Sequence, residues 1–187
     1  GDPIKTFEQK ITWVKGMKGS ERRLAFIRGD LNATRENPAA YKKHVMPVIK
    51  KGDAYTWFHH GLLNVNTGEH DKDPNFTEPT FEELYQEMWL TAPSGDFYDA
   101  YKLVKSWRDA LQKAFWVNAG NPNKAKLVDA LNKMINDPES VAAIEKKVGK
   151  YEWRTGAEGD AAVKTLKSFI TPGALKTLSD FGKNQLG

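Results

Sequence analysis

The sequence predicts an α/β fold, with a layered, mostly parallel sheet and flanking helices. Two observations support this prediction. Short runs rich in β-branched and aromatic residues recur along the chain, and stretches with helical periodicity lie between them. Strands that alternate with helices are typical of such a layered fold. The predicted strands are residues 10–14, 31–34, 54–58, 114–117 and 151–153.

Helices are expected where a capping side chain, a proline at the first helical position or a terminal glycine borders an amphipathic stretch. The expected helices cover 21–28, 38–52 and 160–170, and others begin at Thr80, after Gly95, and at Asn121, Asp137 and Thr171. Pro47 lies inside the second helix and should kink or shorten it. Between the elements, residues 64–79 form a polar loop that is long for a compact domain, as functional or flexible loops often are.

Composition excludes several classes of protein. The chain has 187 residues, 40% of them hydrophobic, with no cysteine and a formal net charge of +4. Without cysteine, disulfides, thiolate zinc sites and cysteine nucleophiles are excluded. No apolar run approaches the ~18 residues that a membrane-spanning helix needs. The basic residues are dispersed among acidic ones, so the sequence does not indicate a nucleic-acid partner.

The histidines are the first candidates for catalysis or metal binding. His59 and His60 precede a polar loop that holds His70, Asp71 and Asp73. Adjacent strand residues point to opposite faces, so His59 and His60 are poorly placed to share one ion. We also find no helical His-x-x-x-His spacing, nucleophile elbow, phosphate-binding glycine loop or specific carboxylate pair. The sequence therefore indicates no metal, no cofactor and no enzyme.

A candidate anion site lies at Gly19 and Ser20, where a predicted turn leads into a helix. Unpaired N–H groups in the first turn of a helix can hold a carboxylate. An ordinary strand-to-helix turn explains the same residues, and both interpretations stay open.

Five segments, taken in order, resemble the substrate-binding receptors of tripartite tricarboxylate transporters, the extracytoplasmic Bug family. They are residues 11–16, with an aromatic residue before a Lys-Gly turn; 24–32, with Leu-Ala and Arg-Gly-Asp; 74–83, with Pro-Thr and a following glutamate; 114–122, an apolar strand before an Ala-Gly-Asn-Pro turn; and 127–149, with Asp-Pro-Glu inside. Each motif is weak singly, but their order and spacing extend the resemblance over roughly residues 10–155.

The resemblance implies a type II periplasmic-binding-protein-like fold that closes on a small organic acid in the periplasm. Such receptors hold ligand carboxylates mainly through main-chain N–H groups, hydroxyls and water. It implies ligand contacts at Gly19 and Ser20 and in the loop of Arg35, Glu36 and Asn37. Many members have an aspartate facing the cleft where this chain has Glu36, and a solvated loop is the competing interpretation.

The family pattern begins upstream of this sequence, so the resemblance implies that the amino-terminal lobe is missing from the chain. Residues 1–110 would form most of a second-lobe-like unit, and residues 111–187 would complete the first lobe. We therefore expect a complementary lobe or second polypeptide as a partner, together with membrane subunits of the transporter. Two other functions stay open: an interaction subunit of a larger complex that binds no solute, and a small α/β enzyme with an unrecognised site.

Overall fold

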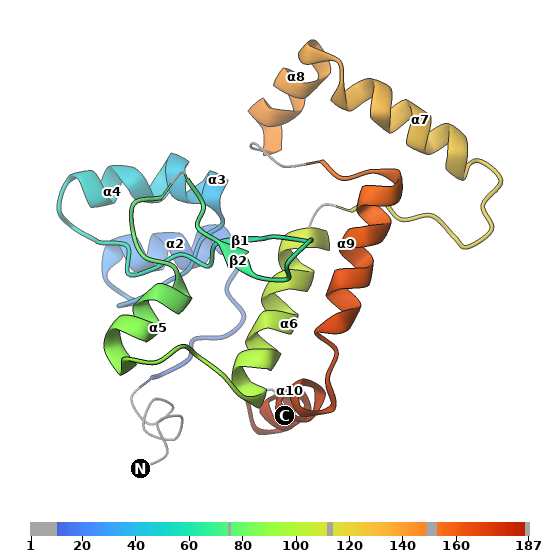
Figure 1. Ribbon diagram of the computed structural model, residues 1–187. Coiled ribbons are helices and arrows are strands. Elements are labelled where there is room, and N and C mark those ends of the chain that lie inside the picture. Colours follow the sequence, from blue (N-terminus) through green and yellow to red (C-terminus); the bar gives the residue numbers. More distant parts are fainter. Residues whose placement is uncertain (1–10, 75, 112–113, 149–152, 186–187) are drawn as a thin grey trace. The chain divides into compact units, whose positions relative to one another are not determined.

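The computed structural model describes residues 11–74, 76–111, 114–148 and 153–185 (Figure 1). Contacts divide the chain into unit 1, Gly1–Tyr55, and unit 2, Thr56–Gly187. The sequence-based lobes, 1–110 and 111–187, are a different division that stays a prediction.

Unit 1 consists of short helices joined by extended chain. They are α2 (Gly19–Arg28), α3 (Pro38–Ala40), the π-helix η1 (Tyr41–Val45) and α4 (Met46–Lys50). Gly29 ends α2 in the left-handed conformation, with φ of 83°, which glycine adopts without a steric cost. The side chain of Asn37 accepts a hydrogen bond from the Ala40 N–H at 2.9 Å and so caps α3.

Pro47 distorts its helix, as the sequence predicts. A proline offers no N–H, and its ring collides with the carbonyl four residues earlier in a regular α-helix. The preceding turn is a π-helix, in which the Met46 N–H donates to the carbonyl of Tyr41, five residues back. This wider turn lets the chain continue through Pro47 into α4 instead of ending there.

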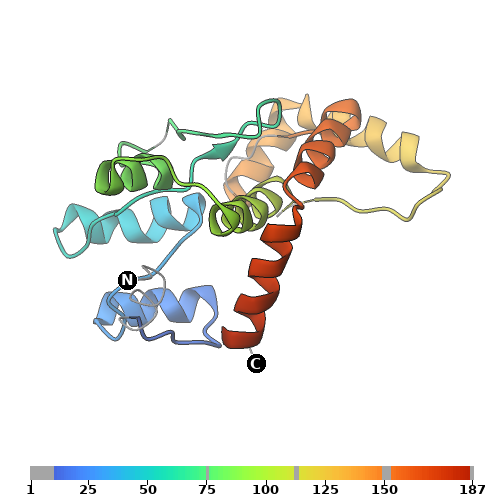
Figure 2. The same ribbon diagram turned by 60° about the horizontal axis from the view of Figure 1, so that its bottom comes forward.

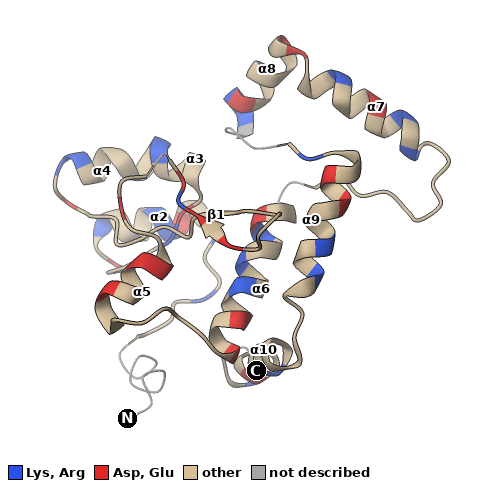
Figure 3. Ribbon diagram, in the orientation of Figure 1, with Lys and Arg blue, Asp and Glu red and all other residues tan. Residues whose placement is uncertain are grey.

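Unit 2 is built from helices around one small hairpin (Figure 1). Its elements are β1 (Leu62–Leu63), β2 (His70–Asp71), α5 (Phe81–Trp89), α6 (Asp96–Leu111), α7 (Lys124–Ile135), α8 (Pro138–Val148), α9 (Gly156–Ser168) and α10 (Pro172–Gln185). The hairpin strands are antiparallel, with Leu62 opposite Asp71 and Leu63 opposite His70. A single parallel bridge joins His59 to Thr80 ahead of α5. Figure 3 shows basic residues without acidic ones along α4 and acidic residues without basic ones along α5, whereas α6 and α7 carry both.

The core of unit 2 lies along α6. Helix α10 crosses α6 (Figure 2), and their small residues Ala100 and Ala174 are buried beside Leu103. Helix α9 also contacts α6 and contributes the fully buried Leu166. Small residues allow two helix backbones to approach closely, so this contact fixes how α6, α9 and α10 are arranged.

The predicted layered, mostly parallel α/β sheet of the type II periplasmic-binding-protein kind is wrong. Helices take up 58% of the described residues and strands 4%, in one two-stranded antiparallel sheet. The described parts of all five predicted strands, 11–14, 31–34, 54–58, 114–117 and 153, are neither helix nor strand. β-favouring residues stabilise a strand only beside a partner strand, and within the described residues no strand pairs with these segments.

Candidate functional site

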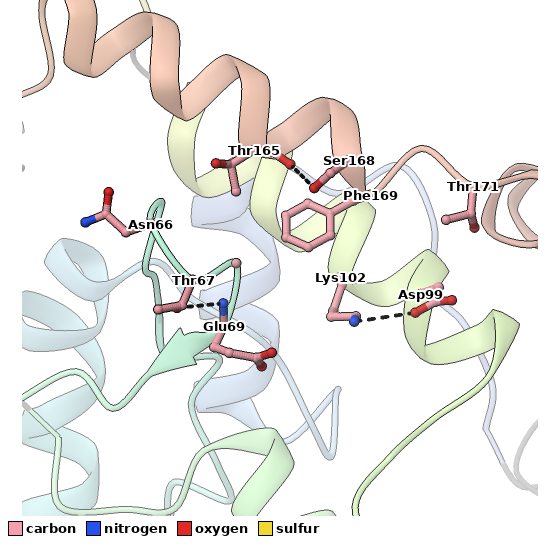
Figure 4. Close-up of a pocket in the computed structure, with 10 residues that line it drawn as sticks. Asn66, Thr67, Glu69, Asp99, Lys102, Thr165, Ser168, Phe169 and Thr171 are labelled. Carbon is pink, nitrogen blue, oxygen red and sulfur yellow. Dashed lines mark hydrogen bonds and ion pairs between the residues drawn. The ribbon is translucent and has the colours of Figure 1, made fainter.

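A cavity of about 430 Å³ lies within unit 2, between the hairpin turn, helix α6, the end of α9 and the loop that leads to α10. Figure 4 shows its residues as sticks. They are Asn66, Thr67, Gly68 and Glu69 from the turn, Asp99 and Lys102 from α6, and Thr165, Ser168, Phe169 and Thr171 from the end of α9 and the loop to α10. The volume falls in the range of small-molecule sites, and the lining is unusually rich in hydroxyl groups.

The hairpin turn is held in place by local hydrogen bonds. The Asn64 side-chain oxygen accepts from the N–H groups of Asn66 and Thr67, at 3.0 and 3.3 Å, and the Gly68 N–H donates to the Asn64 carbonyl at 2.8 Å. An asparagine that bonds to the backbone two residues later is a characteristic turn former. From α9, the Thr165 hydroxyl donates to the Val65 carbonyl at 2.6 Å, which fixes the turn against that helix.

Gly68 is favoured at its position by its backbone conformation. Its φ is 76°, in the region that disfavours side chains, whereas a Cβ there would make only an ordinary contact, 3.4 Å, with the Phe169 ring. We expect Gly68→Ala to lower the free energy of unfolding by about 1–2 kcal/mol, as measured by urea denaturation. Gly182→Ala is the matched control, because Gly182 lies in α10 with open space around its Cα and alanine favours a helix. Equal stabilities for the two variants would contradict this account of the turn.

Lys102 supplies the positive charge of the cavity. Its ammonium lies 3.5 Å from the Asp99 carboxylate, and 4.9 Å from the centre of the Tyr98 ring. In Figure 4 the Lys102 ammonium and the Glu69 carboxylate both extend into the space between the turn and α6. The side chain of Lys102 is mostly buried, so its charge is less screened than that of a surface lysine.

The hydroxyl groups of the cavity differ in what they can still offer. Thr165 and Ser168 donate their hydroxyl protons to backbone carbonyls, at 2.6 and 2.7 Å, and therefore present acceptor lone pairs. The hydroxyls of Thr67 and Thr171 accept from backbone N–H groups, at 3.2 and 3.1 Å, and keep an O–H to donate. The cavity can thus both donate to and accept from a bound molecule.

A second polar group, centred on His70, lies in the interior of unit 2. His70 is fully buried, with Nδ1 3.3 Å from Glu82 and Nε2 3.2 Å from the Ser106 hydroxyl. Burial raises the pKa of Glu82, but hydrogen bonds from His70 and Tyr98 outweigh this effect and leave the pKa below its ordinary value. Since the carboxylate accepts from Nδ1–H, the Ser106 hydroxyl donates to Nε2.

This Ser106–His70–Glu82 array has the order of groups found in serine hydrolases, which short motifs could not reveal because the residues lie 12 and 36 positions apart. Ser106 is fully buried in α6 and does not line the cavity. A nucleophile must reach its substrate, so we assign the array to the packing of β2 and α5 on α6.

Burial also changes the titration of two neighbouring groups. Although part of the His60 side chain meets solvent, desolvation of the rest lowers its pKa to about 4, helped by the positive charge of Lys105. Burial lowers the pKa of Lys105 to about 8, although the Glu82 carboxylate acts in the opposite direction. The His60 ring lies 2.9 Å from the Tyr101 hydroxyl, and Lys105 donates to the Gly61 carbonyl and pairs with Asp109.

The sequence-predicted ligand residues all lie in unit 1. Glu36 is almost fully buried and pairs with Arg23, at 3.0 Å, while Arg35 offers its carbonyl to Arg22, at 2.7 Å. Asn37 caps α3. The structure thus brings the 35–37 loop against α2 through two arginines, and it gives Glu36 and Asn37 intrachain partners.

Gly19 and Ser20 form the first turn of α2. Within the described chain, no hydrogen bond joins either residue to the 35–37 loop. The Glu21 carboxylate accepts from the Lys18 N–H at 2.9 Å, so a negative charge already occupies the start of this helix. The predicted anion site at this turn stays a prediction.

His59 and His70, the histidines before and within the predicted polar loop, have separate partners. His59 accepts from the Gly61 N–H at 3.0 Å and stacks on Phe76, with 5.1 Å between ring centres. Across 11–74, 76–111, 114–148 and 153–185, no three histidine or acidic side chains gather closely enough to hold a metal ion. Within the same ranges, no helix has both the length and the apolar character needed to cross a bilayer.

Comparison with known proteins provides no family assignment. No protein-family model, curated protein or solved structure matches this chain. The function must therefore be argued from the cavity and from the resemblance of the five sequence segments.

Proposed function

We propose that this chain is an extracytoplasmic solute-binding receptor, or a portion of one, that captures a small organic carboxylate for a tripartite transporter. The observation that carries the proposal is the polar cavity of about 430 Å³ with Lys102 in its wall. The ordered resemblance to periplasmic receptors of such transporters supports the same class. The site differs from the one that the resemblance implies, since it lies in unit 2 and not at Glu36.

The chemistry of the cavity suits a carboxylate. The Lys102 ammonium provides a charge-assisted hydrogen bond, and the hydroxyls of Thr67 and Thr171 can donate two more. Receptors need reversible binding, which a single cation and several neutral donors provide more readily than a cluster of arginines. The Phe169 ring forms an apolar wall against which a carbon chain can pack.

Replacing Lys102 tests the assignment of the site. We expect Lys102→Met to weaken carboxylate binding by roughly 10–100-fold, because a hydrogen bond to a charged group is lost while most of the aliphatic stem remains. Calorimetric titration with mono-, di- and tricarboxylates measures the effect, with Lys126→Met in α7 as a control outside the cavity. Equal affinities of the two variants would refute this site, and no response of the original chain to any carboxylate would refute the function.

A second candidate function is an interaction subunit that binds no solute, and one observation favours it. Residues 114–117 run in extended form, with Phe115 73% and Trp116 71% exposed. Their backbone makes no hydrogen bond with another described residue. A β-favouring aromatic segment that pairs with no described strand of its own chain is suited to pair with a strand of a second polypeptide.

Light scattering tests this need for a partner. If a second polypeptide normally covers residues 114–117, the chain alone should self-associate, and Phe115→Ser with Trp116→Ser should reduce that association. Phe97→Ser with Leu175→Ser is the control, since it removes two exposed apolar side chains elsewhere in unit 2. A compact, monodisperse monomer of the original chain would rule out the partner.

A further inference from the structure

The charges that line the cavity constrain what it can hold. Two carboxylates, Glu69 and Asp99, and one ammonium, Lys102, face the same space. The net charge of these three side chains is one negative charge, and the uncharged backbone of the turn does not alter it. A ligand with two or three carboxylates would therefore add more negative charge than the one ammonium can balance, although solvent partly screens the exposed Glu69 carboxylate.

Glu69 and Asp99 differ in whether their carboxylates pair with another described residue. Asp99 pairs with Lys102, whose ammonium is 3.5 Å from its Oδ1. The Glu69 carboxylate makes no hydrogen bond or ion pair with any residue in the described part of the chain, although its N–H donates to Thr67. Glu69 thus offers an acceptor group at the edge of the cavity.

Ser168 adds an acceptor from the end of α9. Its hydroxyl proton is used by the Thr165 carbonyl, so its oxygen presents lone pairs, whereas the Thr165 hydroxyl is directed to Val65 and its methyl group to Gly68. An ammonium group donates three hydrogen bonds and accepts none, and it needs acceptors of this kind. Lys102, Thr67 and Thr171, in contrast, present donors, which a carboxylate needs.

We propose that the cavity takes a zwitterion: a small molecule that carries an ammonium and a carboxylate, as α-amino acids do. Its carboxylate binds Lys102, and its ammonium binds Glu69 and a lone pair of Ser168. A zwitterion adds no net charge, so it avoids the repulsion that a di- or tricarboxylate meets. This inference rests on the proposed function and narrows its class of solute.

Three small molecules that differ by one group test the inference by calorimetric titration of the full chain. They are serine, 3-hydroxypropionate, which lacks the ammonium, and ethanolamine, which lacks the carboxylate. We expect serine to bind at least about tenfold more tightly than either of the others, since each loses a hydrogen bond to a charged group. Equal affinity of serine and 3-hydroxypropionate would overturn the zwitterion and leave the carboxylate receptor standing.

The remaining outcomes are also decisive. Equal affinity of serine and ethanolamine would show that no carboxylate is recognised, which overturns both the zwitterion and the proposed function. If none of the three binds and larger amino acids such as glutamine also give no response, both the zwitterion and the proposed function are overturned. A response to di- or tricarboxylates alone would overturn the zwitterion only.

A substitution at Glu69 tests whether this carboxylate binds the ammonium of the ligand. Glu69→Gln should weaken serine about tenfold and leave 3-hydroxypropionate unchanged, because only serine places an ammonium there. Glu158→Gln in α9 is the matched control, with the same change of charge outside the cavity. If Glu69→Gln weakens both ligands equally, or neither, Glu69 does not hold the ammonium. Circular dichroism of each variant confirms that the helices are intact.

Discussion

Leu166→Ala should lower the free energy of unfolding of unit 2 by about 2–5 kcal/mol, because it leaves a cavity among the helices. Leu166 is fully buried in α9, which contacts α6. The same substitution at Leu175 in α10 is the control, since that side chain is 50% exposed and loses far less apolar burial. Urea denaturation of both variants measures the difference.

The comparison also tests the helical packing itself. If α9 did not pack on α6, Leu166 and Leu175 would be equivalent surface residues. Similar losses of stability in the two variants would therefore contradict the arrangement of the helices. Because the cavity is walled by α6 and α9, such a result would also remove the basis for the site.

Acid should destabilise the protein from about pH 6.5 downward, through His60. Burial keeps the pKa of His60 at about 4 in the folded chain, against an ordinary value of 6.5. Between these values the unfolded chain binds the additional proton, so stability falls as the pH is lowered. Below this range the lowered pKa of Glu82 continues the loss, because protonating its carboxylate weakens its interactions with His70 and Tyr98.

Unfolding in urea at pH 7 and at pH 5 measures this effect. We expect His60→Gln to reduce the loss of stability between these pH values, because glutamine does not titrate. His44→Gln, at an exposed position in η1, should leave the loss unchanged. Because part of the His60 side chain is exposed, solvent screens its charge. The loss of stability between these pH values should therefore be smaller than the pKa difference alone implies. An unchanged pH dependence in His60→Gln would contradict the assignment.

The helices could be predicted from the sequence because local interactions specify their ends. Thr80 and Glu83 form the expected capping box, with hydrogen bonds of 2.8 and 3.1 Å. Asp137 accepts from the Ser140 N–H and Thr171 from the Ala174 N–H, each at the start of its helix. These contacts join residues three positions apart, so the sequence alone contains both partners.

The prediction was less accurate where a cap was ambiguous. The helix expected at Asn121 begins at Lys124, because the Asn121 side chain accepts from the Asn123 N–H and forms a turn instead. The helix expected from about residue 160 begins at Gly156. Propensity and capping patterns fix the existence of a helix better than its first residue.

The sequence could not show that the five predicted strands do not form, because a strand is stable only beside a partner strand that lies elsewhere in the sequence. Residues 54–58 have strong β propensity, but among the described residues they form no strand, and an isolated bridge follows them between His59 and Thr80. Residues 114–117 also have strong β propensity. Their aromatic side chains follow the pattern of a buried strand, but they are exposed. Pattern alone does not show whether a partner strand exists.

The cavity was missed for a related reason. Its two sides, the turn at Thr67 and the helix at Thr165, lie about a hundred residues apart in the sequence, and a hydrogen bond from Thr165 to Val65 joins them. One local signal was available: Asn64 followed by Gly68 in the long polar loop is typical of a structured turn. The length of the loop is typical of functional or flexible loops, but the sequence could not identify its partner helix.

Backbone amide NMR of the full chain titrated with serine tests the central claim most directly, because it locates the bound molecule. The account predicts that serine perturbs the amides of the turn and the facing helix, at Thr67, Gly68, Glu69 and Ser168. Perturbation confined to the sequence-predicted residues of unit 1, around Glu36, would place the site elsewhere. No perturbation by serine or by any carboxylate would contradict the solute-binding account.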